Sequence, residues 1–134
     1  IYGLTKGQYS PTSKLGMINK SAPFGTIDNP VSPVRLALAA GATFVARTAD
    51  NDINHMTETL RRAAEHKGMA FVEILQNCVI FNDKVFEEYY GVKTRKDTLM
   101  YLHDKEPMLY GKTVEKGMAV NGFSLEGIEA STAA

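Results

Sequence analysis

The pattern of apolar and polar residues predicts a strand–helix–strand unit in the middle of the chain. Residues 43–49 and 70–76 carry the β-branched and aromatic side chains typical of strands. Between them, apolar residues recur at helical spacing over about 53–67, with the potential capping residues 50–52 before them and Gly68 after them. A helix of this length allows the two strands to pair in parallel, so we expect a right-handed βαβ unit and an α/β fold.

A shorter helix is predicted just before this unit. Ser32 and Pro33 are suited to the N-cap and the first helical position, and Gly41 to the position after the end. The helix between them is apolar nearly all round, which predicts that it is well buried. Residues 14–30 contain several glycines and prolines and are expected to form a loop, and loops of this length are usually functional or packed against a partner.

The pattern weakens after residue 82. We expect a short helix capped by Asn82 and Asp83 and ended by Gly91, then a strand or extended segment over 98–102. The last residues, 129–134, are expected to fray. The sequence therefore predicts two parts. Residues 1–82 form the main domain, and residues 83–134 form a C-terminal helix and an extended arm that packs on another subunit.

Composition and charge narrow the classes of partner. The chain has 134 residues, 44% of them hydrophobic and 22% charged, which is typical of one globular domain. Fifteen basic residues balance fifteen acidic ones, so nothing indicates a general attraction to nucleic acid or membranes. No apolar run approaches the roughly 20 residues of a membrane span. The single cysteine excludes an internal disulfide, which favours a cytoplasmic location.

The first thirteen residues form the stretch with the clearest potential for chemistry. They combine glycines, threonine and serine hydroxyls, a lysine and a proline, without helical or alternating periodicity. Glycine lets the backbone approach a ligand closely, and backbone N–H groups with hydroxyls can surround an anion or a phosphate–metal pair. On these residues alone, an ordinary surface loop remains the simpler alternative.

Two blocks of sequence carry a resemblance to a known family. They are Tyr2-Gly3-Leu4-Thr5-Lys6-Gly7-Gln8-Tyr9-Ser10-Pro11-Thr12 and His66-Lys67-Gly68-Met69-Ala70-Phe71-Val72-Glu73-Ile74-Leu75-Gln76-Asn77-Cys78, the second followed by Phe81-Asn82. The first resembles the thiamine-diphosphate loop of the β subunit of 2-oxoacid:ferredoxin oxidoreductases. Leu4 and Lys6 make it most similar to the 2-oxoglutarate type, 2-oxoglutarate synthase. The similarity is strong over 1–13, clear over about 22–82, and fades beyond about 110.

The resemblance implies both a fold and a reaction. The fold is part of an open, mostly parallel thiamine-diphosphate-binding sheet with flanking helices. The reaction is the CoA-dependent oxidative decarboxylation of a 2-oxoacid, with ferredoxin as electron acceptor. The implied cofactors are thiamine diphosphate, Mg²⁺ and a [4Fe–4S] cluster, and the implied partner is the α (or fused γα) subunit.

The resemblance also implies that this chain is the C-terminal portion of a longer β subunit. The family has a Gly-Asp-Gly-Asp metal motif and an Asp-Asn pair before the thiamine loop, and neither occurs in these residues. We therefore expect the chain to depend on the N-terminal half of the subunit and to be inactive alone.

The implied cofactor-binding residues lie at the start of the chain: Ile1, Tyr2, Gly3, Leu4 and Thr5. The backbone carbonyl of Ile1 would be a Mg²⁺ ligand, and Thr5 would lie near the diphosphate. Lys6 would pair with the distal carboxylate of 2-oxoglutarate, and Leu4 would shape the same substrate pocket. Without the resemblance, Lys6 is a solvated surface charge, Ile1 an ordinary apolar residue and Thr5 a turn hydroxyl. No residue is assigned a catalytic role.

Cys78 resembles the fourth cysteine ligand of the family's [4Fe–4S] cluster. The alternative is a small buried apolar thiol at the end of a strand. The three histidines are too far apart in sequence for a helical metal site, and His66 is more simply a favourable partner for a helix dipole.

Two other functions remain open from the sequence. One is a thiamine enzyme without ferredoxin, such as a non-oxidative decarboxylase or an acetolactate-type synthase, which Cys78 argues against. The other is a non-catalytic fragment that only binds a partner, which the absent acidic motif leaves open.

Overall fold

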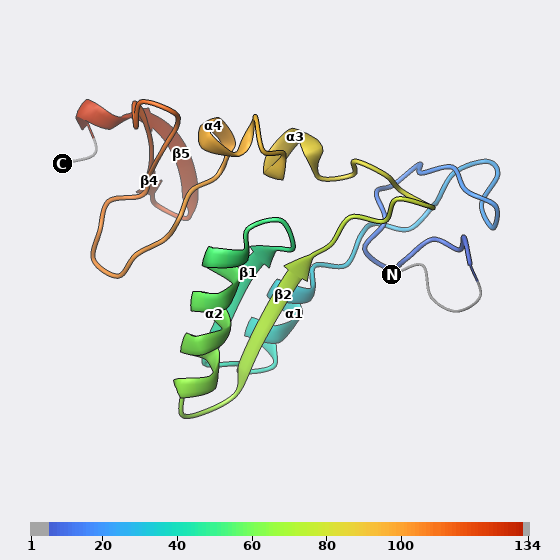
Figure 1. Cartoon of the computed structure of the whole chain (residues 1–134), viewed down its shortest axis with the longest axis horizontal. Helices are drawn as coiled ribbons and strands as arrows, with labels where there is room; N and C mark the ends of the chain where they lie inside the picture. Colours follow the sequence, from blue (N-terminus) through green and yellow to red (C-terminus); the bar gives the residue numbers. More distant parts are fainter. Residues whose placement is uncertain (1–5, 133–134) are drawn as a thin grey trace. The chain divides into compact units, whose positions relative to one another are not determined.

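A parallel strand pair with a crossover helix forms the centre of the fold, as predicted (Figure 1). The structure is a computed structural model that describes residues 6–132. Strands β1 (Phe44–Ala49) and β2 (Ala70–Leu75) pair in parallel along their whole length, from Phe44 opposite Ala70 to Ala49 opposite Leu75. Helix α2 (Ile53–Glu65) connects them and packs on both. The chain divides into two units after Asp83.

Local chemistry explains where α2 begins and how it is held. The Asp52 carboxylate accepts a hydrogen bond from the backbone N–H of His55 at 3.3 Å, which satisfies a donor that the first turn leaves free. On the exposed face, Arg61 pairs with Glu58 at 2.7 Å and with Glu65 at 2.5 Å. The hydrogen bond from Arg61 holds the pKa of the Glu58 carboxyl below its usual value.

Helix α1 (Pro33–Ala39) begins as predicted but is not buried as predicted. The Ser32 hydroxyl accepts from the Arg35 N–H at 3.4 Å, and Gly41 follows the helix with a φ of 84°. Only Ala37 is buried, whereas Leu36 and Leu38 are 63% and 57% exposed. The reason is geometric, because within the first unit the two strands contact this short helix while its leucine side chains stay exposed.

Residues 6–31 form the irregular segment that their glycines and prolines predicted. Backbone hydrogen bonds hold it together, including Val31 N–H to the Pro11 carbonyl at 2.8 Å and Gly16 N–H to the Thr26 carbonyl at 2.8 Å. Gly25 has a φ of 95°, and a Cβ there would lie 2.9 Å from the Gly16 oxygen. A side chain at this position would collide with the backbone that the loop folds against.

The second unit forms an antiparallel sheet where an extended arm was expected. Its strands follow the order β3–β4–β5, and β4 and β5 form a hairpin. Its elements are α3 (Glu87–Tyr90), α4 (Arg95–Thr98), β3 (Leu109–Tyr110), β4 (Lys116–Asn121), β5 (Ser124–Glu129) and the 3₁₀ helix η1 (Ala130–Thr132). The hairpin closes through Gly122, whose φ of 60° suits the first central position of a tight turn.

Three further expectations for this unit differ from the structure. Helix α3 begins after Phe86 without a side-chain cap, so Asn82 and Asp83 do not cap it, although it ends at Gly91 as predicted. Thr98 ends helix α4 and does not begin a strand. Residues 130–132, for which no element was expected, form the 3₁₀ helix η1, and the Thr132 hydroxyl donates to the Glu129 carbonyl at 2.6 Å. None of the helices within 6–132 has the length and hydrophobicity needed to cross a bilayer.

Candidate functional site

The candidate site residues are partly covered by the structure. Ile1, Tyr2, Gly3, Leu4 and Thr5 lie outside the described residues, so their cofactor, Mg²⁺ and substrate roles stay predictions. Lys6 and Cys78 are described, and both belong to the first unit.

Lys6 and Gly7 form a turn of two consecutive residues with left-handed backbone. Lys6 has a φ of 58° and Gly7 a φ of 86°. A left-handed conformation costs a residue other than glycine roughly 1–2 kcal/mol, so surrounding contacts must hold Lys6 in it. Lys6 is exposed, whereas Gly7 is buried. The turn therefore presents the lysine to solvent while its glycine packs against protein.

The partner of Gly7 is the ring of Phe81. A Cβ placed on Gly7 would lie 3.5 Å from Phe81 Cε1 and 3.6 Å from Lys20 Cδ. Glycine is thus favoured at this position by its positive φ. The Phe81 ring and the aliphatic part of the Lys20 side chain lie next to it. Phe81 is the third residue after Cys78, so the opening loop lies beside the segment that carries the chain's single cysteine.

Cys78 stands at the base of a short turn just beyond the end of β2. Cys78 and Asn82 form an isolated antiparallel bridge, in which the Asn82 N–H donates to the Cys78 carbonyl at 2.9 Å. The turn is tied on the side of Asn77, whose backbone N–H donates to Asp50 at 3.3 Å and whose side chain donates to Asp83 at 2.8 Å. The thiol is half-buried and forms no disulfide.

The position of this turn matches the general rule for ligands in open α/β sheets. Ligands bind in the crevice beyond the carboxyl ends of parallel strands. β1 ends at Ala49 and β2 at Leu75, so both Asp50 and the turn that starts at Cys78 lie at that end of the pair. The two sequence blocks that are far apart in the chain meet here, through Gly7 and Phe81.

The described residues contain no complete metal site of their own. Within the part of the chain that the structure describes, no three His, Cys, Asp or Glu side chains gather to hold a metal ion. A four-thiolate iron–sulfur cluster needs four cysteines, and the sequence has one. Cys78, a free and half-buried thiol, would fit the role of one ligand of such a cluster, and the other three ligands would have to come from outside these residues.

Sequence reasoning missed a group of buried hydroxyls that shapes the loop behind Lys6. Ser10, Ser13 and Thr26 are buried. The Ser13 hydroxyl accepts from the Ser10 N–H at 2.9 Å, and the Thr26 hydroxyl donates to the Lys14 carbonyl at 2.7 Å. They adjoin a cavity of about 340 Å³ beside Tyr9 and Asp28. The signal was the run Ser-Pro-Thr-Ser, because hydroxyl residues around a proline often bond their own backbone in turns.

Two of the three histidines, His55 and His66, have structural partners. His66 is the residue after α2, as its predicted place at the helix C-terminus requires, and its Nε2 is 2.7 Å from the Thr43 hydroxyl. His55 Nδ1 is 2.9 Å from the buried Thr48 hydroxyl. The bond of His55 joins α2 to β1, and the bond of His66 joins the end of α2 to the residue before β1. These two histidines therefore stabilise the packing of the helix on the strand.

Comparison with known proteins finds a matching family and several relatives. Residues 1–74 match the family described as thiamine pyrophosphate enzyme, C-terminal TPP binding domain. A 2-oxoglutarate oxidoreductase subunit KorB from Mycobacterium tuberculosis is 50% identical over 126 residues, which are 94% of this chain and 34% of that protein. A 2-oxoacid:ferredoxin oxidoreductase subunit beta from Saccharolobus solfataricus is 43% identical over 80% of this chain and 33% of its own length.

A solved structure is also similar. It is a 2-oxoglutarate:ferredoxin oxidoreductase from Magnetococcus marinus with 2-oxoglutarate, coenzyme A and succinyl-CoA bound. The match has a TM-score of 0.59 and 43% sequence identity, and covers 62% of this chain and 28% of that one.

These matches define the family of the chain and the extent of the match. The chain spans about a third of the length of the curated relatives that it matches, at 34% and 33% for the two above. Its parallel strand pair with flanking helices agrees with the fold that the resemblance implied. The chain therefore belongs to the thiamine pyrophosphate enzymes, with the β subunits of 2-oxoacid:ferredoxin oxidoreductases as its relatives.

Proposed function

We propose that this chain is part of the thiamine-binding β subunit of a cytoplasmic 2-oxoglutarate:ferredoxin oxidoreductase. The reaction is the oxidative decarboxylation of a 2-oxoacid with coenzyme A, and its electrons pass to ferredoxin. The observation that carries the proposal is the closeness of Gly7 to the Phe81 ring, which places the predicted thiamine loop beside the segment that contains Cys78. Relatives that cover 94% and 80% of this chain are named as subunits of oxidoreductases of this class.

The opening residues would hold the cofactor. Ile1 to Thr5 would surround the diphosphate with backbone N–H groups and the Thr5 hydroxyl, and the Ile1 carbonyl would be one oxygen ligand of Mg²⁺. Thiamine diphosphate, when bound, supplies the carbanion chemistry that decarboxylation of a 2-oxoacid requires. The packing of Gly7 on Phe81 would keep the adjoining loop in place for binding.

Lys6 would select the substrate. Its side chain is exposed on a turn whose backbone is held by the buried Gly7, so an ammonium is presented beside the predicted cofactor loop. A dicarboxylate such as 2-oxoglutarate offers a second carboxylate for this charge, and pyruvate does not. Leu4 would supply an apolar wall to the same pocket.

Cys78 would supply one thiolate to a [4Fe–4S] cluster. Its half-buried thiol on a braced turn is suited to a ligand that must keep one position. Such a cluster, when bound, carries one electron at a time. The remaining thiolates, the acidic Mg²⁺ ligands and the far side of the cofactor pocket would come from the rest of the β subunit and from the α (or fused γα) subunit.

The assembled enzyme tests this proposal. Protein isolated with its partner subunits should reduce ferredoxin only when 2-oxoglutarate, coenzyme A and thiamine diphosphate are all present, and should form the acyl-CoA in step. Release of CO₂ and an aldehyde, without ferredoxin reduction, would favour the thiamine enzyme without ferredoxin. Turnover that continues after thiamine diphosphate is removed would contradict the proposal.

A further inference from the structure

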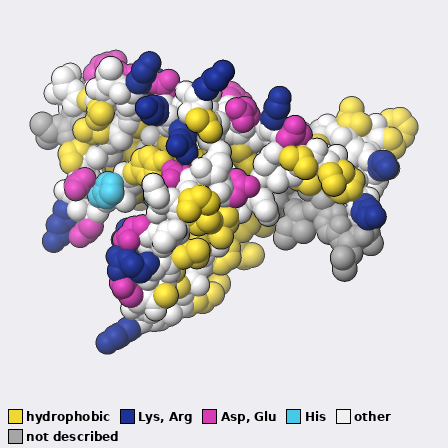
Figure 2. All heavy atoms as spheres, viewed as in Figure 1, with side chains coloured by type: hydrophobic (Ala, Val, Ile, Leu, Met, Phe, Trp, Pro, Cys, Tyr) yellow, Lys and Arg dark blue, Asp and Glu magenta, His cyan; other side chains and the backbone are white. Residues whose placement is uncertain are grey.

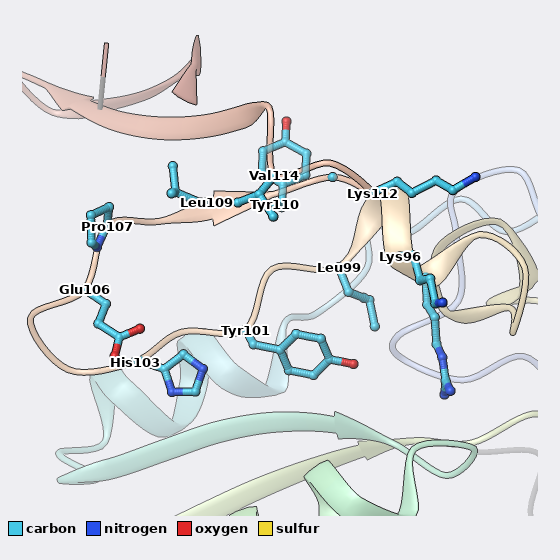
Figure 3. Close-up of a pocket in the computed structure, with 12 residues that line it drawn as sticks. Lys96, Leu99, Tyr101, His103, Glu106, Pro107, Leu109, Tyr110, Lys112 and Val114 are labelled. Carbon is cyan, nitrogen blue, oxygen red and sulfur yellow. The ribbon is translucent and has the colours of Figure 1, made fainter. Parts of the chain in front are cut away.

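The cavity of the second unit lacks converging functional groups. It has a volume of about 470 Å³ and lies between α4 and the residues around β3 (Figure 3). The Lys112 side chain and the Tyr110 ring are directed away from the other lining groups in Figure 3. A small-molecule site needs polar groups that point at one ligand, and this lining does not supply them. Groups that do converge belong to the first unit.

The turn that follows Cys78 has one side chain that the described part of the chain covers. The turn ends at Asn82, whose backbone N–H donates to the Cys78 carbonyl at 2.9 Å. Within it, Val79 and Ile80 are 74% and 78% exposed, whereas Phe81 is half-buried. Phe81 is therefore directed into the protein from a turn whose other side chains face outward.

The Phe81 ring faces the opening loop at Gly7. A Cβ placed on Gly7 would lie 3.5 Å from Phe81 Cε1 and 3.7 Å from Phe81 Cδ1, so one edge of the ring is turned toward the glycine. Gly7 has no side chain of its own to anchor it, yet it is buried. The ring and the Lys20 side chain thus limit where the backbone at Gly7 can lie.

The position of Gly7 determines that of Lys6. The two residues are adjacent and both have left-handed backbone, with φ values of 58° for Lys6 and 86° for Gly7. Such a conformation persists at a residue other than glycine only when its surroundings hold it. If the Phe81 ring were removed, the turn could relax toward ordinary backbone angles, and the Lys6 ammonium would point elsewhere.

The base of the Phe81 turn is itself held in place. The Asn77 backbone N–H donates to the Asp50 carboxylate at 3.3 Å, which ties the turn to the end of β1. The Asn77 side chain donates to Asp83 at 2.8 Å and so links the two ends of the turn. A side chain on such a base can hold a neighbouring loop in one position.

We propose that Phe81 is a positioning residue for substrate selection and that it acts through Lys6. The ring holds the turn of Lys6 and Gly7 in the conformation that presents the ammonium to the distal carboxylate of a dicarboxylic 2-oxoacid. A charge-assisted pair depends on distance and direction, so a displaced ammonium loses the pair even though its charge remains. This inference rests on the proposed function, because it takes the role of Lys6 from there.

Substrate preference in the assembled enzyme tests the inference. Phe81→Ala should lower kcat/KM for 2-oxoglutarate relative to pyruvate by roughly tenfold, because the ammonium is misplaced. In the Lys6→Ala background the same substitution should change this ratio by less than about twofold, since the pair that it positions is already absent. Phe81→Tyr keeps the ring and should retain most of the preference. Ile80→Ala is the matched control, an exposed residue of the same turn, and should leave the ratio within about twofold.

Limited digestion with trypsin gives a readout that needs no turnover. Trypsin cleaves after lysine, and the buried Gly7 should protect the bond that follows Lys6. In the assembled protein, Phe81→Ala should speed cleavage at this bond, and Ile80→Ala should not. Cleavage after Lys93, in the second unit, serves as the internal measure of general unfolding.

The possible failures are distinguishable. An unsubstituted enzyme that does not oxidise 2-oxoglutarate would contradict the proposed function. If it does oxidise 2-oxoglutarate, an unchanged substrate ratio in Phe81→Ala, or unchanged cleavage after Lys6, would overturn this inference alone. An equal shift of the ratio in the Lys6→Ala background would also overturn it, because Phe81 would then act independently of Lys6. If faster cleavage after Lys93 shows that Phe81→Ala is unfolded, Phe81→Leu removes the ring at similar hydrophobicity and must shift the ratio on its own.

Discussion

The backbone conformation of Lys6 determines where its ammonium group is presented. Surface lysines are usually mobile and solvated, but this one occupies a left-handed turn that is anchored by the buried Gly7. The left-handed backbone of Lys6 costs free energy, and the placement of Gly7 beside the Phe81 ring helps to offset that cost. The ammonium is therefore presented from a defined backbone position, as substrate selection by charge requires.

Replacement of Lys6 by alanine should change substrate preference more than overall catalysis. In the assembled enzyme, Lys6→Ala should lower kcat/KM for 2-oxoglutarate by roughly ten- to hundredfold, because one charge-assisted pair with the distal carboxylate is lost. Pyruvate has no such carboxylate and should be little affected. Steady-state kinetics on both substrates measure the ratio, and equal losses on the two would remove Lys6 from substrate selection.

Cys78 can also be tested as a single residue, because its thiol is either a ligand of an iron–sulfur cluster or a structural thiol. Cys78→Ser in the assembled enzyme should lower the iron content and abolish ferredoxin reduction, because a serine hydroxyl is a poor replacement for a cluster thiolate. Thiamine diphosphate binding should persist. Iron analysis and the absorbance spectrum measure the first effect, and calorimetry measures the second. Full iron content in the variant would restore the alternative of a structural thiol.

At the scale of elements, the short helices of the second unit depend on tight backbone packing. Helix α3 has four residues and no side-chain cap, so its end must be defined by contacts of the chain itself. Gly91 is where this happens. A Cβ at Gly91 would overlap the Glu87 carbonyl oxygen, at a separation closer than the two atoms can approach.

Two glycine-to-alanine substitutions distinguish the steric effect at Gly91 from the general effect of alanine on stability. Gly91→Ala should destabilise the second unit by about 1–3 kcal/mol, the usual cost of forcing extra volume into a packed site. Gly127→Ala should be neutral or slightly stabilising, because a Cβ at Gly127 in β5 meets nothing within 4 Å and its φ is not positive. Thermal unfolding of the two variants gives the comparison. Equal losses would show that the contact at Glu87 does not limit the helix.

At the scale of the whole molecule, the chain has a small apolar core. The buried apolar residues of the described part are Ala37, Ala42 and Ala49, and none is large. Several large apolar side chains are exposed, and hydrophobic atoms reach the surface over much of the face in Figure 2. Phe24 and Phe123 are fully exposed. A globular protein normally buries such residues, so these surfaces favour contact with further protein.

The 134-residue chain by itself should therefore show neither the cluster nor the activity. After reconstitution with iron and sulfide under reducing conditions it should stay colourless, because one cysteine cannot form a four-thiolate site. It should also release no CO₂ from 2-oxoglutarate with thiamine diphosphate and Mg²⁺ added. The assembled enzyme, treated in parallel, is the positive control. A cluster spectrum from the isolated chain would contradict the proposed role of Cys78.

Local patterns determined the central fold from the sequence alone. The strand–helix–strand order, the cap at Ser32 and the end at Gly41 are all short-range features, because they depend on periodicity and capping within one or two turns. The resemblance in two blocks led to the family that the comparisons support. The roles of Ile1 to Thr5, Lys6 and Cys78 remain predictions.

Only the tertiary structure decided the features that depend on distant partners. The burial of α1 was predicted wrongly, because Leu36 and Leu38 have an apolar pattern but stay exposed within the first unit. The hairpin around Gly122 was missed because its strands bury few side chains and their alternation is weak. The contact of Gly7 with Phe81 joins residues more than seventy positions apart, and no local pattern encodes such a meeting.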